Sequence, residues 1–243
     1  MMAAAQTLLL LLEKCRAGSS WRLDPTNYNS GTGGTVTLAS AWFQLGKGVS
    51  TLPEMILIGQ LTSYDYKDIL PPLPPQVAAI FESADALNWL NQIADSNSIS
   101  STILAVIHPD LYSAGQKTLN VLRQSSEIHQ QDVLRRWNSV FSGISVIFGG
   151  TVSAHRDSQS RYHWYDLLIT LGHYQGCKLN LPGVGLSLNY GPGTVVGLSG
   201  MVLQHQVSKF EGERVSYAYF MRDNVHDWAK VPAGSWMRTG YYE

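Results

Sequence analysis

The last part of the chain is a succession of short apolar segments, each followed by a glycine or proline turn. Six of them follow Asp157 within fewer than ninety residues, at 164–171, 177–181, 185–190, 194–198, 201–207 and 214–221. Segments of this length and spacing are typical of antiparallel sheets, in which tight turns join neighbouring strands. The pattern predicts an antiparallel β-barrel or β-sandwich in this part of the chain.

The residues before this part have a different pattern. Apolar positions predict helices at 1–16, 76–91, 111–122 and 127–137. Strands are expected at 35–41, 54–60 and 139–148, and a proline-rich spacer at 71–75. Because no linker composition separates the two parts, we expect a single domain over 1–243. Its helix-rich part, with some strands, is 1–137, and the β-rich part that carries the site is 138–243.

Composition excludes several classes of protein. With 44% hydrophobic residues among 243, the chain can bury a substantial core. Its two cysteines, Cys15 and Cys177, imply neither a disulfide framework nor a cysteine-rich zinc module. A formal net charge of −1 predicts no overall affinity for nucleic acid. No apolar run reaches the ~20 residues that cross a bilayer, and residues 1–12 lack the basic start of an export signal, so we expect a soluble protein with no membrane partner.

Two histidines and one aspartate stand at a spacing that suits a metal ion. In His155-Arg156-Asp157, the first and third side chains of an extended segment point to the same side. His205 lies on a later strand that can double back to meet them. Two imidazole nitrogens and one carboxylate on one face of Fe(II) leave three positions for a co-substrate and O2. His155, Asp157 and His205 are therefore the predicted ligands of a non-haem Fe(II) oxygenase.

Arg214 and Ser216 add an anchor for an anionic co-substrate. Arg214 follows His205 by nine residues, and Ser216 lies two residues further on the same face of a strand. A guanidinium holds a carboxylate through two charge-assisted hydrogen bonds, and a serine hydroxyl adds one more. The pair suits the distal carboxylate of 2-oxoglutarate, whose other end can chelate iron. Arg214 thus joins the three metal ligands as a catalytic candidate.

Other interpretations of the histidines are open at this point. His108-Pro109-Asp110 is a second His-X-Asp, so His108, Asp110 and His155 form a rival metal set. The proline instead favours a turn in which Asp110 caps the following helix. An inactive barrel that keeps the site residues as a hydrogen-bonded cluster is also compatible with the sequence. The remaining histidines are not spaced in the sequence like metal ligands; they are His129, His163, His173 and His226.

Over residues 100–243 the chain resembles a known family. The resemblance lies in the His155-Arg156-Asp157 motif and in the segments 165–172, 179–186, 192–196, 205–207 and 214–222. These are similar to the TET/JBP-type 2-oxoglutarate and Fe(II) dioxygenases, particularly the fungal branch. The resemblance implies an α+β fold, with a jelly-roll or cupin-like double-stranded β-helix and flanking N-terminal helices.

The resemblance also implies a reaction and roles for residues. Such enzymes oxidise 5-methylcytosine in duplex DNA to 5-hydroxymethylcytosine and further, with the target nucleotide flipped out of the stack. Some fungal relatives also demethylate N6-methyladenine. By motif, His155, Asp157 and His205 would bind iron and Arg214 would hold 2-oxoglutarate. Phe220 and Arg222 would flank the flipped base.

Two departures from the family affect the substrate. The cysteine-rich region of animal TET enzymes is absent. Where Naegleria-like relatives carry an acidic residue for the exocyclic amine of the base, this chain has Ser158, Gln159 and Ser160, which we take as candidate substrate contacts. The same chemistry on RNA, a protein side chain or a small molecule is also compatible with the sequence, as is a non-catalytic binding module, and the oligomeric state is open. A DNA substrate would imply a nuclear location.

Overall fold

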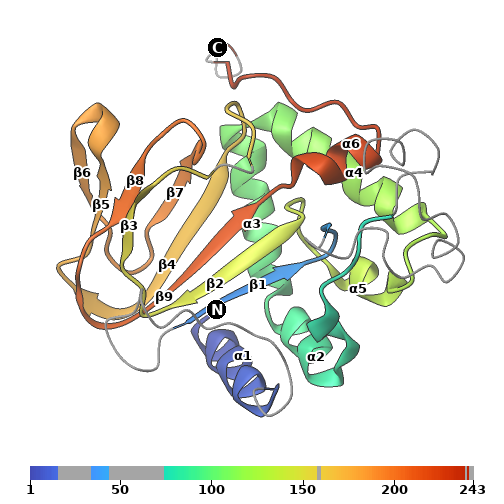
Figure 1. Cartoon of the computed structure of the whole chain (residues 1–243), viewed down its shortest axis with the longest axis horizontal. Helices are drawn as coiled ribbons and strands as arrows, with labels where there is room; N and C mark the ends of the chain where they lie inside the picture. The colour runs from blue at the N-terminus through green and yellow to red at the C-terminus, as the bar shows by residue number, and fades with distance from the viewer. Residues whose placement is uncertain (16–33, 44–73, 158–159, 239, 241–243) are drawn as a thin grey trace, which may run out of the picture.

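The chain folds into two antiparallel sheets with helices packed on one side (Figure 1). The computed structural model describes residues 1–15, 34–43, 74–157, 160–238 and 240. The helices are α1 (Met2–Cys15), η3 (Ala79–Glu82), α2 (Ala84–Gln92), α3 (Ala94–Ile107), α4 (Pro109–Gln124), α5 (Gln131–Arg136), η4 (Pro182–Val184) and α6 (Asp223–Trp228). The strands are β1 (Gly34–Ala39), β2 (Gly143–Phe148), β3 (Val152–His155), β4 (Asp166–Gln175), β5 (Lys178–Leu181), β6 (Leu186–Asn189), β7 (Val195–Leu198), β8 (His205–Val207) and β9 (Glu211–Phe220). Within these residues, no helix combines the length and the apolar character that crossing a membrane requires.

The strands form two sheets that face each other. One has the order β1-β2-β9-β4-β7 and the other the order β3-β8-β5-β6, and every named pair is antiparallel. A small apolar cluster between them includes Leu179, Tyr190 and Val207. The structure is therefore a mixed helix-and-sheet fold with a jelly-roll core, which confirms the fold class predicted above.

The alternation of side chains along each strand determines what the two faces of the five-stranded sheet contact. On β9, the side chains of Val215, Tyr217 and Tyr219 are buried in the main apolar core. Arg214 and Ser216, on the opposite face, line a cavity between the sheets. Successive side chains of a strand point to opposite faces, so one strand serves both the core and the cavity. The same alternation holds along β2.

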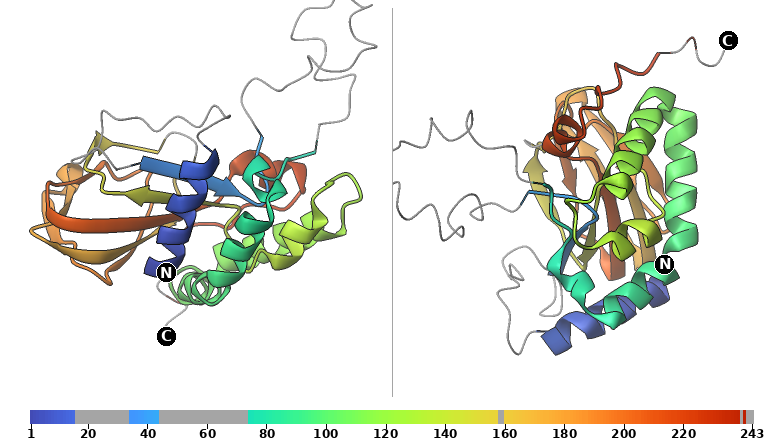
Figure 2. Two further views of the ribbon diagram at one scale, coloured as in Figure 1. Left: turned by 90° about the horizontal axis from the view of Figure 1, so that it is seen from below. Right: turned by 90° about the vertical axis from the view of Figure 1, so that its right-hand side faces the viewer.

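Helices cover the face of the five-stranded sheet that is turned away from the cavity (Figure 2). Leu104 of α3 and Leu111 of α4 belong to the same buried cluster as the apolar residues of β9. The largest fully buried side chains there include Trp89 and Trp137. Burying a large apolar side chain stabilises a fold by about 1.5–3 kcal/mol. This helical layer therefore stabilises one face of the five-stranded sheet and leaves the opposite face free to line the cavity.

One predicted helix is divided in the structure, and two observed α-helices, α3 and α6, were not predicted. The segment predicted as one helix at 76–91 is divided into η3 and α2, because the backbone of Ser83 is extended and its hydroxyl caps α2 by accepting from the Ala86 N–H. Helix α3 was not predicted, because its serine-rich sequence has weak helical periodicity and exposes Ile99 and Val106. The strand predicted at 54–60 and most of the proline-rich spacer lie outside the described residues.

Candidate functional site

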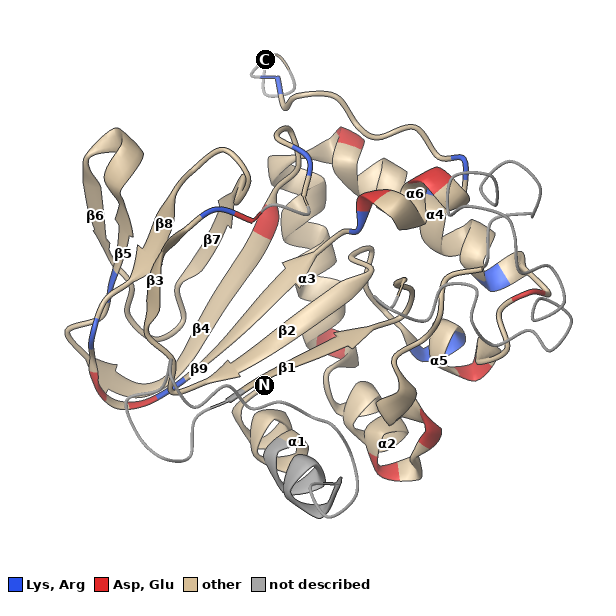
Figure 3. Cartoon of the chain, viewed as in Figure 1, with Lys and Arg blue, Asp and Glu red and all other residues tan. Residues whose placement is uncertain are grey.

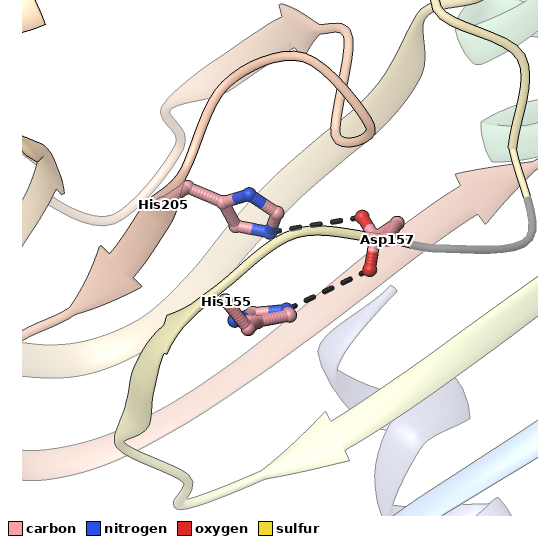
Figure 4. A group of neighbouring side chains, drawn as sticks. All are labelled: His155, Asp157 and His205. Carbon is pink, nitrogen blue, oxygen red and sulfur yellow. Dashed lines mark ion pairs between the residues drawn. The ribbon is translucent and has the colours of Figure 1, made fainter. Parts of the chain in front are cut away.

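Three side chains from two paired strands converge at one edge of the four-stranded sheet (Figure 4). His155 at the end of β3 pairs with His205 at the start of β8, and their ring centroids lie 4.2 Å apart. Asp157 places Oδ1 3.6 Å from His155 Nε2 and Oδ2 3.7 Å from His205 Nε2. In the described part of the chain, this is the one group of three whose possible ligand atoms all lie within 4.8 Å of one another. The structure thus brings the three predicted metal residues together.

Backbone carbonyl groups orient both imidazole rings. His155 Nδ1 lies 2.9 Å from the carbonyl oxygen of Ser153, and His205 Nδ1 lies 3.0 Å from that of Leu203. A carbonyl oxygen can only accept, so in the neutral rings Nδ1 carries the proton and donates it. The lone pair of each Nε2 is then directed toward Asp157. Metal-binding histidines are commonly fixed through the other ring nitrogen in this way.

The loop before β8 positions the segment that carries Asp157. The Asp157 N–H donates to the Gly200 carbonyl oxygen at 2.9 Å, and the Arg156 Nε–H donates to the Val202 carbonyl oxygen at 3.0 Å. Asp157 lies two residues beyond the end of β3, so these loop bonds, rather than sheet pairing, hold its backbone. Its side chain is 43% exposed, which leaves one side of the cluster open to further ligands.

A cavity of about 500 Å³ between the two sheets joins this cluster to Arg214 and Ser216. Both residues are buried, and neither Arg214 Nε nor Ser216 Oγ has a hydrogen-bond partner. A buried polar group without a partner costs about 1–3 kcal/mol, so such atoms indicate a missing ligand with acceptor oxygens. A dicarboxylate that spans from Arg214 to the metal cluster meets this requirement.

Aromatic rings surround the Arg214 guanidinium. Its central carbon lies 5.0 Å from the ring centroid of Tyr190, 5.6 Å from that of Phe210 and 5.9 Å from that of Tyr174. Its Nη1 donates to the Gly150 carbonyl oxygen at 3.3 Å. Among the described residues, no carboxylate forms an ion pair with it. The rings hold the cation through cation–π contacts and leave it available to an incoming carboxylate.

Asp166 is a cavity residue that the sequence analysis missed. It begins β4, is only 6% exposed, and lines the cavity together with Arg222. Burial raises the pKa of its carboxyl well above the usual value; the charge of Asp157 raises it further, and Arg222 opposes both. The available signal was an acidic residue at the head of an otherwise apolar strand, 166–171.

The predicted substrate contacts have different positions. Ser158 and Gln159 lie outside the described residues. Ser160 lines the cavity, and its buried Oγ has no hydrogen-bond partner. Phe220 and Arg222 also line it, with the Arg222 guanidinium 4.5 Å from the Phe220 ring centroid. The described candidates therefore lie on the wall of the same cavity as the metal cluster.

The rival metal set does not form. Both ring nitrogens of His108 are engaged: Nδ1 accepts from the Leu111 N–H at 3.3 Å, and Nε2 donates to the His163 carbonyl oxygen at 2.9 Å. His108, and not Asp110 as predicted, therefore caps α4 with its side chain. His226 is likewise engaged, with Nδ1 3.2 Å from Thr118 Oγ1.

Comparisons with solved structures give limited similarity. The structure titled as NgTET1 in complex with 5mC DNA matches with 16% identity and a TM-score of 0.47, covering 69% of this chain and 62% of that one. A Cupin 2 conserved barrel domain protein from Salinispora arenicola matches with 19% identity and a TM-score of 0.26, covering 36% of this chain and 69% of that one. The chain thus spans less than two thirds of the NgTET1 structure. No curated protein sequence matches significantly.

A family comparison is more specific. The Tet_JBP model, described as the oxygenase domain of the 2OGFeDO superfamily, matches residues 64–223, which is more than half of the chain. Enzymes of that superfamily use Fe(II), 2-oxoglutarate and O2. The two imidazoles and the carboxylate suit Fe(II), and the unpaired atoms of Arg214 and Ser216 suit 2-oxoglutarate. The chain therefore belongs to the Tet_JBP family of oxygenase domains within the 2-oxoglutarate- and Fe(II)-dependent dioxygenases.

Proposed function

We propose that this dioxygenase oxidises the methyl group of a modified base in DNA. The primary substrate is 5-methylcytosine, which is converted to 5-hydroxymethylcytosine and then oxidised further. N6-methyladenine is a second substrate, which loses its methyl group after hydroxylation. The observation that carries the proposal is the shared cavity, which joins a three-residue metal cluster to the Arg214 Nε and the Ser216 hydroxyl, two buried groups without a hydrogen-bond partner. The choice of DNA follows the resemblance of the motifs to the TET/JBP enzymes.

The residues of the cavity have different roles in the proposed reaction. His155, Asp157 and His205 hold iron on one face, and Arg214 with Ser216 holds the distal carboxylate of 2-oxoglutarate. Bound Fe(II), with O2 and 2-oxoglutarate, supplies the oxidising power that inserts oxygen into a C–H bond. In the overall reaction, the methylated base, O2 and 2-oxoglutarate give the hydroxymethylated base, succinate and CO2.

Other residues of the cavity lining receive the base. Phe220 offers a ring face, and Arg222 lies over that ring with its guanidinium 4.5 Å from the centroid. Ser160 Oγ and the buried carboxyl of Asp166 are polar groups on the same lining. A cavity of about 500 Å³ is in the size range of small-molecule sites. A duplex base reaches such a site by flipping out of the stack.

Three further assignments accompany this proposal. We place the chain in the fungal branch of its family, because its motifs most resemble that branch and its two cysteines cannot build the cysteine-rich region of animal TET enzymes. We assign the catalytic activity to the whole chain as one domain, since β1 comes from the helix-rich part and pairs with β2 of the β-rich part. A DNA substrate further implies that the protein acts in the nucleus.

The test is mass spectrometry of nucleosides from matched duplexes that carry 5-methylcytosine, N6-methyladenine or no methyl group. Each is incubated with the protein, Fe(II), 2-oxoglutarate and O2, and succinate is measured in parallel. We expect oxidised cytosine, or loss of the adenine methyl group, in amounts that rise together with the amount of succinate. The Asp157→Ala variant should give neither product. The same incubations are carried out with methylated RNA of the same sequence.

The outcomes separate the alternatives. Succinate release without a change in any methylated DNA base would overturn the DNA assignment and leave an oxygenase with another substrate. Conversion of methylated RNA alone would change the nucleic acid while keeping the chemistry. If neither succinate nor oxidised product forms with any substrate and the metal cluster binds no Fe(II), the domain is a binding module rather than an enzyme.

A further inference from the structure

A second hollow adjoins the proposed substrate cavity near the start of α6. Ser160 and Arg222 line both spaces, so the two share a wall. Tyr162, His163 and Asp223 also line the second hollow. A molecule that places one group in the cavity can therefore extend its neighbouring part into the hollow. A flipped base has such a neighbouring part, because it stays joined to the strand from which it comes.

The rings of Tyr162 and His163 line this hollow, and the Trp236 ring lies next to that of His163. The ring centroids of Tyr162 and His163 lie 6.3 Å apart, and those of His163 and Trp236 lie 6.0 Å apart. Tyr162 is 58% exposed and Trp236 is 54% exposed, the two exposed aromatic residues among the described large hydrophobic ones. Rings exposed to this degree beside a cavity indicate a contact surface for an apolar or aromatic partner.

The charged groups of the hollow balance one another. Arg161 forms ion pairs with Asp223 and with Asp227, the latter at 2.9 Å between Nη2 and Oδ1. Arg222 is the second arginine, so two cations face two carboxylates. Burial and the charge of Arg161 lower the pKa of His163, which favours its neutral ring at pH 7. Net attraction for phosphate is therefore small, and the rings are the main groups available for recognition.

We propose that the hollow lined by Tyr162 and His163, together with the Trp236 ring beside His163, binds the nucleotide next to the target base, by stacking on these rings. The inference rests on the proposed function, since it requires a nucleic-acid substrate. Stacking on an aromatic face tolerates any of the four bases, because each has a π-face. The hollow therefore contributes affinity for a strand with little selection among its sequences.

The test compares variants that remove a ring with variants that keep one. Binding of a duplex with one methylated base is measured by fluorescence anisotropy, and KM and kcat are measured for the same duplex. Tyr162→Ala and Trp236→Ala are each expected to raise Kd and KM about tenfold, with kcat at saturating DNA within about twofold of the parent. Tyr162→Phe and Trp236→Phe keep a ring face and are expected to bind within about twofold of the parent.

A matched control and the salt dependence sharpen the test. Ile99→Ala removes another exposed apolar side chain, 60% exposed on α3 and remote from the hollow, and should leave Kd unchanged. Because stacking rather than phosphate pairing is removed, the slope of log Kd against log salt should stay the same in the alanine variants.

Three results would overturn the inference, and they are distinguishable. If the parent protein oxidises methylated duplexes and the two alanine variants bind them as tightly as the parent, only the stacking surface is wrong. If the phenylalanine variants lose as much affinity as the alanine variants, stacking is not the interaction. If the parent neither binds nor oxidises methylated nucleic acid, the proposed function itself fails, and this surface loses its basis with it.

Discussion

A side chain at Gly200 would collide with Asp157. A Cβ built on Gly200 lies 2.1 Å from Asp157 Oδ2 and 2.9 Å from Asp166 Oδ2, both well inside contact distance. The carbonyl oxygen of the same glycine accepts the Asp157 N–H at 2.9 Å. The residue therefore positions the carboxylate through its backbone and makes room for it by lacking a side chain.

Gly200→Ala is expected to weaken metal binding at least tenfold, because the methyl group displaces the Asp157 carboxylate from the two histidines. The measurement is anaerobic titration with Co(II), followed by its absorption bands. Gly191→Ala is the matched control, since a Cβ there meets no atom within 4 Å. Equal Co(II) affinity in the Gly200 variant and the parent would show that the carboxylate adapts to the methyl group.

The two neighbouring carboxyl groups of the cavity have different roles and can be separated. Asp157→Asn is expected to lower Co(II) affinity by a factor of a hundred or more, because an anionic ligand is replaced by a neutral one. Asp166→Asn is expected to keep Co(II) affinity within about tenfold, since Asp166 is not in the cluster of possible ligand atoms. Titration of both variants in parallel checks this, and comparable losses would make Asp166 a ligand.

Removing the guanidinium of Arg214 is expected to abolish co-substrate binding without unfolding the protein. In Arg214→Met, a buried cation that pairs with no carboxylate of the described residues is replaced by an apolar side chain of similar length, so the ligand-free protein should be as stable as the parent or more stable. Thermal unfolding with and without 2-oxoglutarate measures this.

The parent should gain several degrees in Tm with 2-oxoglutarate and Mn(II), and Arg214→Met should gain none from the acid. Ser216→Ala, which removes one hydrogen-bond donor, should weaken 2-oxoglutarate binding by a smaller factor of about five to ten. A 2-oxoglutarate-induced shift in Arg214→Met equal to that of the parent would place the acid elsewhere.

His226 makes stability depend on pH. Its ring is 1% exposed, and burial, followed by the charge of Arg161, lowers its pKa to about 4 against the opposing charge of Asp227. An unfolded histidine titrates near 6.5, so the unfolded chain takes up a proton first as the pH falls. The stability contributed by this group is fully present above pH 6.5 and is lost as the pH falls toward 4, by about 2–3 kcal/mol.

In His226→Gln, this loss of folding stability at low pH should be absent. Urea denaturation at pH 7 and at pH 4.5 gives the free energy of unfolding of both proteins, and the difference between the two pH values should be smaller in the variant by about 2–3 kcal/mol. The Thr118 hydroxyl can still pair with the glutamine amide, which limits other effects of the change. Identical pH dependence in the two proteins would show that the buried ring does not titrate in this range.

The sequence predicted most strands of the β-rich part, and the convergence of His155, Asp157 and His205, because both depend largely on short-range patterns. Alternating apolar residues and turns define each strand of the β-rich part, and the i, i+2 spacing places His155 and Asp157 on one side. The pairing of His155 with His205 also needs a register between two strands fifty residues apart, which the structure provides. That His205 and Arg214 come near the same cavity follows from the topology and not from their separation in the chain.

The groups around the site were harder to predict. Gly200 and Tyr190 come near the site residues only after the two sheets face each other, and nothing local in the sequence distinguishes them from turn or core residues. Helix α3 was missed because its many serines obscure the helical spacing of its apolar residues. The hydroxyls of three of these serines and of Thr102 donate to carbonyl oxygens of the preceding turn. Local patterns therefore predict the ligands, whereas packing decides the residues that orient them.

Strand β1 pairs with β2 although more than ninety residues and most of the helices separate them. An expression fragment that starts after the helices would consequently leave the β2 edge of the large sheet bare, with its row of unsatisfied amides and carbonyls. Exposed edges of this kind recruit strands from other molecules. Any shortened version intended for crystallisation or enzymology should retain residues 34–39, since without them self-association competes with refolding.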